Sequence, residues 1–417
     1  MQKPNTQMER KETNQKREQD MTFAVSDLGF VWDVVLGIWG LFSERRSQMR
    51  RVELAVALAV VLALGAVASA DTIAPDRLEY QGAFKTTHLG YFNNHGGLAY
   101  YPGGDAGNGS LYGVRNNGIV ELDIPTDLRK KSDGFTFATL VAANKLQGPT
   151  GPGFNGKSLE YLPASRTGLG SDKLFYGKAQ PGNHAYCNLD MSGQQGPWKL
   201  SGVDDRRVGS YISEIPQSWV DANLPTGQIL TTGYDWGQYG YGADLYAYNP
   251  LDPAPGTSLP ATKLIEYNSS NPMPDFDKDD DWEGSAWPES AADSAMLITG
   301  TKDTNNNGRT ADTPVYKAWM LFYDPADLAA VAAGGNTYDP AAYATLDVSD
   351  LMFEEQRYFV GTAYDREKNV LYATEYIGSS KQIIHVWHIA EPALPIPEPA
   401  GLSLIGLALL SLRKRRS

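Results

Sequence analysis

Short apolar runs separated by turn residues dominate the chain from Asp71 onward. Runs rich in Tyr, Leu, Val and Ile alternate with segments that contain glycine and proline, a pattern that predicts many short β-strands. Only residues 325–334 have the alanine-rich composition of a helix, with Asp324 or Asp327 available to cap its start. The pattern therefore predicts an all-β domain.

The predicted strands recur in groups of three, with a further extended stretch between groups. Five groups occur, and they begin near residues 97, 156, 209, 284 and 361. Four-stranded blades joined by loops of variable length fit this spacing, and closure into a ring removes exposed sheet edges. Residues 78–84 would complete the last sheet and close the ring. We predict a β-propeller-like ring of about five four-stranded blades, with a β-sandwich or an irregular β-solenoid as the alternative.

Residues 49–70 have the order of a secretory signal peptide, which is expected to be helical. Arg50 and Arg51 precede an apolar run, and Ala68-Ser69-Ala70 forms a small-residue site at which signal peptidase would cut before Asp71. Residues 1–48 are interpreted as an upstream extension that reflects the choice of start codon. A real membrane-proximal segment is the alternative.

Three blocks follow one another at the C-terminus, over residues 395–417. A proline-rich turn is followed by an uncharged apolar run, 400–412, and then by four cations. Thirteen residues form about 20 Å of helix, whereas a bilayer-spanning helix needs about 20 residues. Cations remain on the cytoplasmic side, so we expect this membrane helix to leave the rest of the chain outside. The residues that define the blocks are Pro397, Glu398 and Pro399, then Arg413, Lys414, Arg415 and Arg416.

This arrangement resembles the PEP-CTERM sorting signal, whose tripeptide matches residues 397–399. The resemblance implies export, recognition by a membrane exosortase, removal of the tail and association with an extracellular polysaccharide matrix. An ordinary C-terminal anchor or a buried terminal helix is the alternative. Under this interpretation the chain is a cell-surface or matrix protein, transiently anchored in the membrane, whose exported domain is 71–394.

The exported part carries most of the negative charge. The formal charge of the whole chain is −13, and the two ends contribute +1 and +3, which leaves −17 on residues 71–395. Such a surface disfavours nucleic acid and anionic lipid and favours cation binding. The single cysteine, Cys187, excludes an intramolecular disulfide and a Cys-rich zinc site, and its neighbours predict a packed strand position.

Two acidic segments are candidate calcium sites. Residues 303–308 match the first half of a calcium-binding loop, with alternating oxygen ligands and a glycine at the turn. The closing glutamate is missing, although Asp312 could replace it; a hydrophilic hairpin is the alternative. Residues 275–283 contain six carboxylates, which repel one another unless they are solvated or neutralised by a cation. The predicted ligands are Asp303, Asn305, Asn307 and Asp312 in one segment and Asp275, Asp277 and Asp279 in the other.

The same acidic segment could also supply an acid–base pair for glycoside cleavage. No common catalytic motif such as G-x-S-x-G, H-E-x-x-H or a phosphate-binding loop occurs. His385 and His388 fall on opposite faces of a predicted strand and cannot share a metal there. We therefore expect structural or surface roles for the five histidines, and the sequence favours a non-catalytic protein.

Four aromatic residues lie in a glycine-spaced segment, 234–242. Exposed rings beside Asp and Gln would suit stacking on a sugar, whereas packing between blades is the alternative. The residues are Tyr234, Trp236, Tyr239 and Tyr241. The first hypothesis is thus an exported propeller that binds matrix polysaccharide or a surface protein. The second is an extracellular propeller hydrolase or lyase that acts on glycans.

Overall fold

The computed structural model describes most of the exported region. The described residues are 71–89, 96–115, 118–150, 156–178, 184–236, 240–251, 258–290, 293–304, 315–354, 359–377 and 382–392. The upstream extension, the signal peptide with Ala68 and Ala70, and the sorting signal with residues 397–399 and 413–416 lie outside them. Among the described residues, no helix has both the length and the apolar character needed to cross a membrane.

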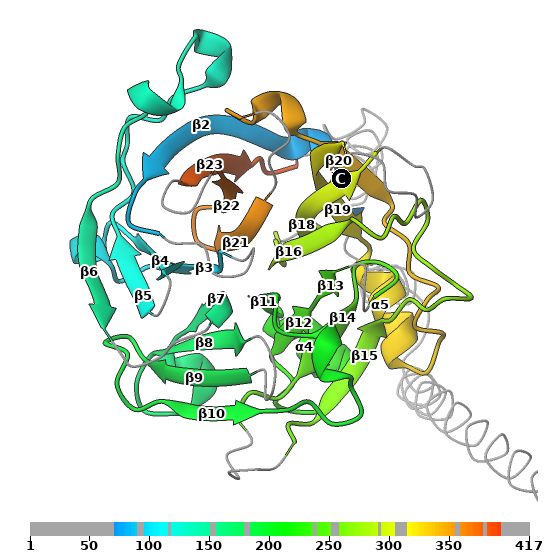
Figure 1. The fold of residues 1–417 in the computed structure, drawn as a ribbon. Helices are drawn as coiled ribbons and strands as arrows, with labels where there is room; N and C mark the ends of the chain where they lie inside the picture. The colour runs from blue at the N-terminus through cyan, green and yellow to red at the C-terminus, as the bar shows by residue number, and fades with distance from the viewer. Residues whose placement is uncertain are drawn as a thin grey trace, which may run out of the picture. The chain divides into compact units, whose positions relative to one another are not determined.

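Five antiparallel sheets stand around a common axis, as the sequence predicts (Figure 1). We number these blades in chain order. Blade 1 contains β3 (Leu98–Tyr101), β4 (Ser110–Arg115), β5 (Gly118–Leu122) and β6 (Lys145–Thr150). Blade 2 contains β7 (Gly156–Leu162), β8 (Lys173–Lys178), β9 (His184–Asn188) and β10 (Gln195–Trp198). Blade 3 contains β11 (Tyr211–Glu214), β12 (Leu230–Gly233), β14 (Leu245–Tyr248) and β15 (Ala261–Ile265).

The last two blades each depart from simple chain order. Blade 4 contains β16 (Asp281–Ala286), β18 (Met296–Asp303), β19 (Tyr316–Tyr323) and β20 (Ala344–Asp347), with β13 (Asp235–Trp236) added at its inner edge. Blade 5 contains β21 (Phe359–Asp365), β22 (Val370–Tyr376), β23 (Gln382–Ile389) and, as its outer strand, β2 (Leu78–Thr86). The N-terminal strand therefore closes the ring, which confirms the prediction for residues 78–84.

The outer edge of β2 is not left open. The connection between β5 and β6 runs beside it, and the Ala83 amide donates to the Arg129 carbonyl at 2.8 Å, as does the Lys85 amide to the Val141 carbonyl. Exposed strand edges are templates for association with other chains. This segment of blade 1 covers the edge at the point where the ring closes.

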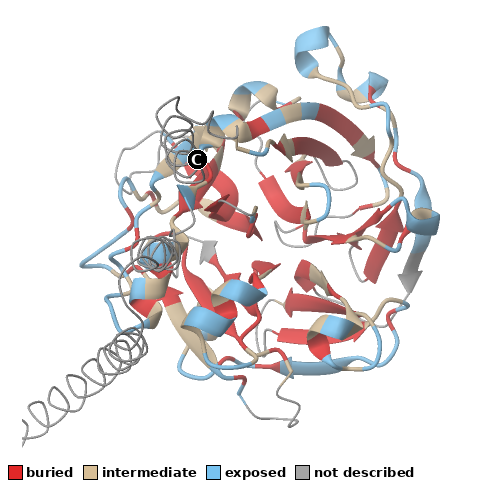
Figure 2. Cartoon of the chain, turned by 180° about the vertical axis from the view of Figure 1, so that it is seen from behind, coloured by how far each residue is buried: buried red, intermediate tan, exposed pale blue. Residues whose placement is uncertain are grey.

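The helices among the described residues are short, and Figure 2 shows exposed residues on them in pale blue. The predicted helix is α5 (Pro325–Ala332), and the Asp324 side chain caps it by accepting from the Ala326 amide at 2.8 Å. The sequence did not indicate α3 (Ala164–Thr167) or α4 (Gln217–Asn223), which are too short to show a helical period. The remaining elements are the strands β1 (Asp71–Thr72) and β17 (Asp293–Ser294), which pair in parallel, and the 3-10 helices η1 (Pro75–Arg77), η2 (Asp105–Gly107), η3 (Lys131–Asp133), η4 (Phe137–Thr139), η5 (Asp205–Arg207) and η6 (Ser349–Leu351).

Large apolar side chains fill the space between neighbouring blades. Trp282 and Trp287 are fully buried with residues of blades 3 and 4, and Trp387 is buried between blades 4 and 5. Cys187 is buried in β9, as predicted, with its Sγ 3.8 Å from the Met191 Sδ. Since the core lies between the blades, the blades depend on one another for stability.

The inner strands β3, β7, β11, β16 and β21 meet at the axis in the same orientation. Near their beginnings, the Gly96 amide donates to the Val360 carbonyl at 2.6 Å, and the Ser158 hydroxyl donates to the Gly209 carbonyl at 3.0 Å. Near their ends, Arg366 contacts Glu214. We call the side where the inner strands begin the N-end of the ring, and the side where they finish the C-end.

The axis is closed between these two ends. A Cβ atom at Gly97 would collide with the Ser158 backbone, and one at Gly361 with the Gly96 carbonyl. The inner strands approach so closely that no room remains for a water molecule at this level. The N-end and the C-end are therefore separate surfaces.

Candidate functional site

Two carboxylates of β16 form a pair at the N-end. The sequence predicted a loop over residues 275–283. This prediction is wrong for the end of the segment, because β16 begins at Asp281. Asp281 and Glu283 lie two residues apart on β16, close enough for the ionisation of one to affect the pKa of the other. Glu283 is fully buried, whereas Asp281 is half-buried and so forms the outer member of the pair.

A lysine from another blade lies within the electrostatic reach of this pair. Lys157, on β7, is buried, and its Nζ lies 4.8 Å from the centre of the Tyr234 ring. Burial lowers the pKa of Lys157 to about 8, and the negative charges of Glu283 and Asp281 partly offset this effect. Burial raises the pKa of both carboxyls, and for Glu283 the neighbouring Asp281 raises the pKa further. The pair therefore tends to keep a proton at neutral pH.

Strand β13 brings the aromatic segment to the same location. Asp235 pairs with Trp282, and Trp236 pairs with Asp281, although β13 arises from a connection within blade 3. The sequence treated the aromatic segment and the acidic segment as separate candidates. The β13–β16 ladder joins them, and this long-range pairing left no local signal in the sequence.

The aromatic side chains that the structure describes are packed. Tyr234 is buried, and Tyr241 is half-buried with its ring centre 5.9 Å from that of Phe276. This agrees with the packing alternative. The Trp236 side chain and Tyr239 lie outside the described residues.

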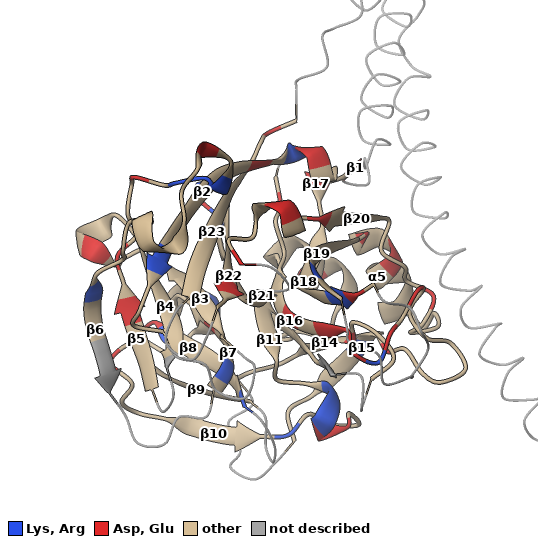
Figure 3. Ribbon diagram, turned by 45° about the horizontal axis from the view of Figure 1, so that its top comes forward, with Lys and Arg blue, Asp and Glu red and all other residues tan. Residues whose placement is uncertain are grey.

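The two predicted calcium segments also meet. Asp277, Asp279 and Asp303 each offer a carboxylate oxygen, and the three oxygens lie within 4.8 Å of one another. The three residues could hold a metal ion, and Figure 3 shows acidic residues in red beside β16. Asp275 is exposed and is not a member of this group, while Asn305, Asn307 and Asp312 lie outside the described residues.

A buried ion pair holds the two acidic segments together. The Lys302 Nζ lies 2.9 and 3.0 Å from the two carboxylate oxygens of Asp280, and both side chains are almost completely buried. The same carboxylate accepts from the Asp277 amide at 3.0 Å and from the Asp303 amide at 2.9 Å. Asp280 thus positions two members of the three-carboxylate group, a role that its place in an acidic run did not reveal.

A different charged network occupies the C-end. Arg166 donates to Glu214 at 2.7 Å, and Arg366 donates to the other Glu214 oxygen at 2.8 Å and to the Trp287 carbonyl at 3.1 Å. Burial raises the pKa of the nearby Glu160 to about 8, while the charge of Arg366 opposes this shift. Because these residues come from blades 2, 3, 4 and 5, the network ties four blades together.

His385 and His388 both contact residues of neighbouring strands. His385 is buried, with Nε2 2.8 Å from Glu375 and Nδ1 2.9 Å from the Tyr80 hydroxyl. His388 is more exposed and lies 3.6 Å from Glu79. The two rings lie in different surroundings on β23, as the sequence predicts.

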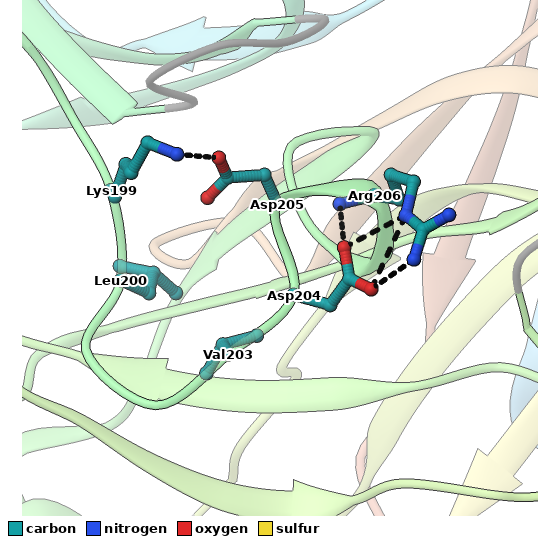
Figure 4. Close-up of a pocket in the computed structure, with 6 residues that line it drawn as sticks. All are labelled: Lys199, Leu200, Val203, Asp204, Asp205 and Arg206. Atoms are coloured by element: carbon teal, nitrogen blue, oxygen red, sulfur yellow. Dashed lines mark hydrogen bonds and ion pairs between the residues drawn. The ribbon is translucent and has the colours of Figure 1, made fainter.

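A surface pocket of about 400 Å³ lies in the connection between β10 and β11 (Figure 4). Its charged residues satisfy one another: Lys199 pairs with Asp205, and Arg206 contacts Asp204 at 2.6 Å. The Arg206 guanidinium and amide lower the pKa of Asp204 to about 2. The charged residues of this pocket are therefore paired with one another, and none of them belongs to the Asp277, Asp279 and Asp303 group at the N-end.

Comparison with known proteins gives only remote likenesses. No protein-family model matches the chain, and no curated protein matches it. One solved structure, from work on GH130 mannoside phosphorylases and glycoside hydrolases that target β-1,2 mannosidic linkages in Candida mannan, has 13% identity and a TM-score of 0.38. That match covers 77% of this chain and 88% of the other. A glycosyl hydrolase from Bacteroides ovatus also has 13% identity and a TM-score of 0.38, over 78% of this chain and 98% of the other. At these scores the likeness says nothing about what this chain binds or does.

Proposed function

We propose that this chain is an exported protein that cleaves extracellular glycans, with Asp281 and Glu283 as its proton-transfer pair. The observation that carries the proposal is the placement of two buried or half-buried carboxyls on one inner strand, within the electrostatic influence of the buried Lys157, at one end of the propeller axis. Titratable groups whose surroundings shift their pKa values toward neutrality are suited to acid–base catalysis. Glycosidases usually work with two carboxyls that flank the scissile bond about 5–9.5 Å apart, whereas a closer pair would act as one acid–base group.

The burial of the two carboxyls suggests different roles. Asp281 is the more exposed member, so it is the group that would exchange a proton with the substrate. Glu283 lies deeper and would hold the shared proton, while Lys157 balances the negative charge when the pair ionises. Since the two carboxyls lie two residues apart on one strand and affect each other's pKa, they would act on one side of the scissile bond as a single unit. We therefore propose glycan cleavage by this pair without choosing between hydrolysis and elimination.

Export is the second part of the proposal. The segment 49–70 would direct secretion with cleavage by signal peptidase, and the segment 395–417 would be processed by an exosortase. The PEP-CTERM resemblance and the short, cation-flanked apolar run support this route. The protein would then act at the cell surface or in the extracellular matrix, on polysaccharide that the cell itself exports.

The cation group supports a second candidate function, calcium-dependent binding of matrix polysaccharide or of a surface protein. Asp277, Asp279 and Asp303 supply the hard oxygen ligands that calcium prefers. Co-sedimentation of the full chain with exopolysaccharide, with calcium and then with a chelator, tests it. If the chelator abolishes retention of the protein in the polysaccharide pellet, binding depends on calcium. Equal retention with calcium and with chelator would show that binding does not require calcium.

Cleavage is tested by incubating the full chain, purified in detergent, with exopolysaccharide from the producing cell. Mass spectrometry of the soluble fragments separates hydrolysis, which adds water to the products, from elimination, which leaves an unsaturated sugar. We expect fragments with the unaltered chain and with Asp133→Asn, an exposed control in blade 1, but not with Asp281→Asn. Equal release by Asp281→Asn, or no release by any form, would overturn the proposal.

A further inference from the structure

The described chain enters and leaves the propeller at one location. Leu78 pairs with Ile389 in the β2–β23 ladder. Just before and after this pair, the Ala390 amide donates to the Arg77 carbonyl at 3.0 Å, and the Arg77 Nε donates to the Ala390 carbonyl at 2.6 Å. The segment that leads to the C-terminal signal therefore starts beside the segment that leads in from the N-terminus.

This location belongs to the C-end of the ring. The Ile389 amide donates to the Asn369 carbonyl at 2.8 Å, and the Asn369 side chain donates to Glu391 at 2.7 Å. Asn369 lies in the turn between β21 and β22, three residues after Arg366, whose guanidinium contacts Glu214 at the C-end. The last described residues thus leave the domain on the side of the Arg366–Glu214 network.

The proton-transfer pair lies on the opposite side. Asp281 is the first residue of its inner strand, and the axis between it and Arg366 is closed. The group Asp277, Asp279 and Asp303 is on the same side as Asp281, since Asp281 pairs with Thr301 near the end of β18. The two ends of the ring therefore differ in function: one carries the candidate chemistry and the other carries the chain exit.

We infer that the C-end faces the membrane while the chain is anchored, so that the Asp281–Glu283 pair faces outward, toward extracellular polymer. This inference rests on the proposed anchoring by the C-terminal segment. Eight residues, 392–399, separate Glu391 from the apolar run, and they reach at most about 28 Å when extended. Four of the eight are proline, which stiffens a linker and limits its paths.

The same orientation keeps the three-carboxylate group away from the lipid. The carboxylates of Asp277, Asp279 and Asp303 gather at the N-end, and contact with lipid would remove water from them at a cost in free energy. With the C-end toward the lipid, these carboxylates are separated from the headgroups by the height of a blade. That height is about 23 Å, because β21 has seven residues at about 3.3 Å each.

The orientation can be measured by energy transfer from single dyes to lipid-bound acceptors. The full chain would be reconstituted through its C-terminal segment into phosphatidylcholine vesicles that contain an acceptor-labelled lipid. Two exposed positions serve as dye sites: Glu367→Cys at the C-end and Thr304→Cys at the N-end. The native Cys187 is buried, and burial raises its pKa to about 12, so it should not react; the unaltered chain is the labelling control.

We expect strong transfer from position 367 and weak transfer from position 304, with the two dyes differing by about 20 Å in distance from the acceptor plane. Equal transfer from the two positions, or stronger transfer from 304, would overturn the orientation while leaving anchoring intact. Failure of the chain to stay with the vesicles would overturn both the orientation and the proposed anchoring. Cleavage of glycan by the detergent-solubilised chain is independent of either result.

Discussion

The Asp280–Lys302 ion pair should be among the most sensitive positions of the N-end. Both side chains are buried, with 0% and 5% of their surface exposed, and Asp280 also accepts the Asp277 and Asp303 amides. Asp280→Asn leaves the Lys302 ammonium buried without its counter-ion. Removal of one partner of such a pair costs about 3–5 kcal/mol, because the remaining charge is uncompensated. We expect the free energy of unfolding at pH 7.5 to fall by that amount.

Equilibrium unfolding in urea would measure this loss. Asp347→Asn is the matched control, since Asp347 forms a comparable 2.7 Å ion pair with Lys317 in which both side chains are about 40% exposed. Exposed pairs of that kind contribute about 0–1 kcal/mol. Adding Lys302→Met to Asp280→Asn should recover part of the loss, because the unpaired charge is removed. A loss below about 1 kcal/mol for Asp280→Asn, equal to that of the control, would refute the argument that this pair holds the two acidic segments.

Two further predictions concern the axis. Folding raises the pKa of Glu160 from 4.5 to about 8, so the folded chain binds more protons at this residue than the unfolded chain between these pH values. The contribution of Glu160 to the free energy of unfolding is therefore fully present below pH 4.5 and falls as pH rises toward 8. The free energy of unfolding of Glu160→Gln, relative to that of the unaltered chain, should therefore rise by about 2–4 kcal/mol between pH 4.5 and pH 8.5. Urea unfolding across that pH range measures it, and the same pH dependence of stability in the two forms would contradict the prediction. Gly361→Ala should lose about 3 kcal/mol, because its Cβ meets the Gly96 carbonyl. The control Gly134→Ala lies at an open position with a left-handed backbone, so its free energy of unfolding should fall by only about 1 kcal/mol. Equal melting temperatures for Gly361→Ala and Gly134→Ala would contradict the close packing of the inner strands at the axis.

Much of the architecture could be predicted from sequence because each blade repeats its own local pattern. Strand runs near 97, 156, 209, 284 and 361 each begin a unit, and in the structure each unit supplies an inner strand. Ring closure by residues 78–84 was also predictable, since the fifth unit had no later strand to complete it. The start of β16 was placed three residues too late, because Asp281 and Glu283 are charged residues in a buried strand.

The site was less accessible to sequence reasoning. The residues of both acidic segments were identified, but nothing in their spacing showed that Asp303 lies beside Asp277 and Asp279. Lys157 carried no signal at all, since it lies on β7 in another blade and interacts electrostatically with the carboxyls only because the ring closes. Long-range contacts of this kind depend on how the blades close, which short windows of sequence do not encode.

The most direct test of the central claim is the rate of glycan cleavage by Glu283→Gln, with Asp133→Asn as the control. Glutamine has nearly the shape of a protonated glutamate, so folding should be retained, and far-ultraviolet circular dichroism would verify it. Loss of a proton-transfer group costs about 10²- to 10⁴-fold in rate. The account predicts a loss in this range for Glu283→Gln with unchanged cleavage by the control. Cleavage by a folded Glu283→Gln at the rate of the unaltered chain would contradict it.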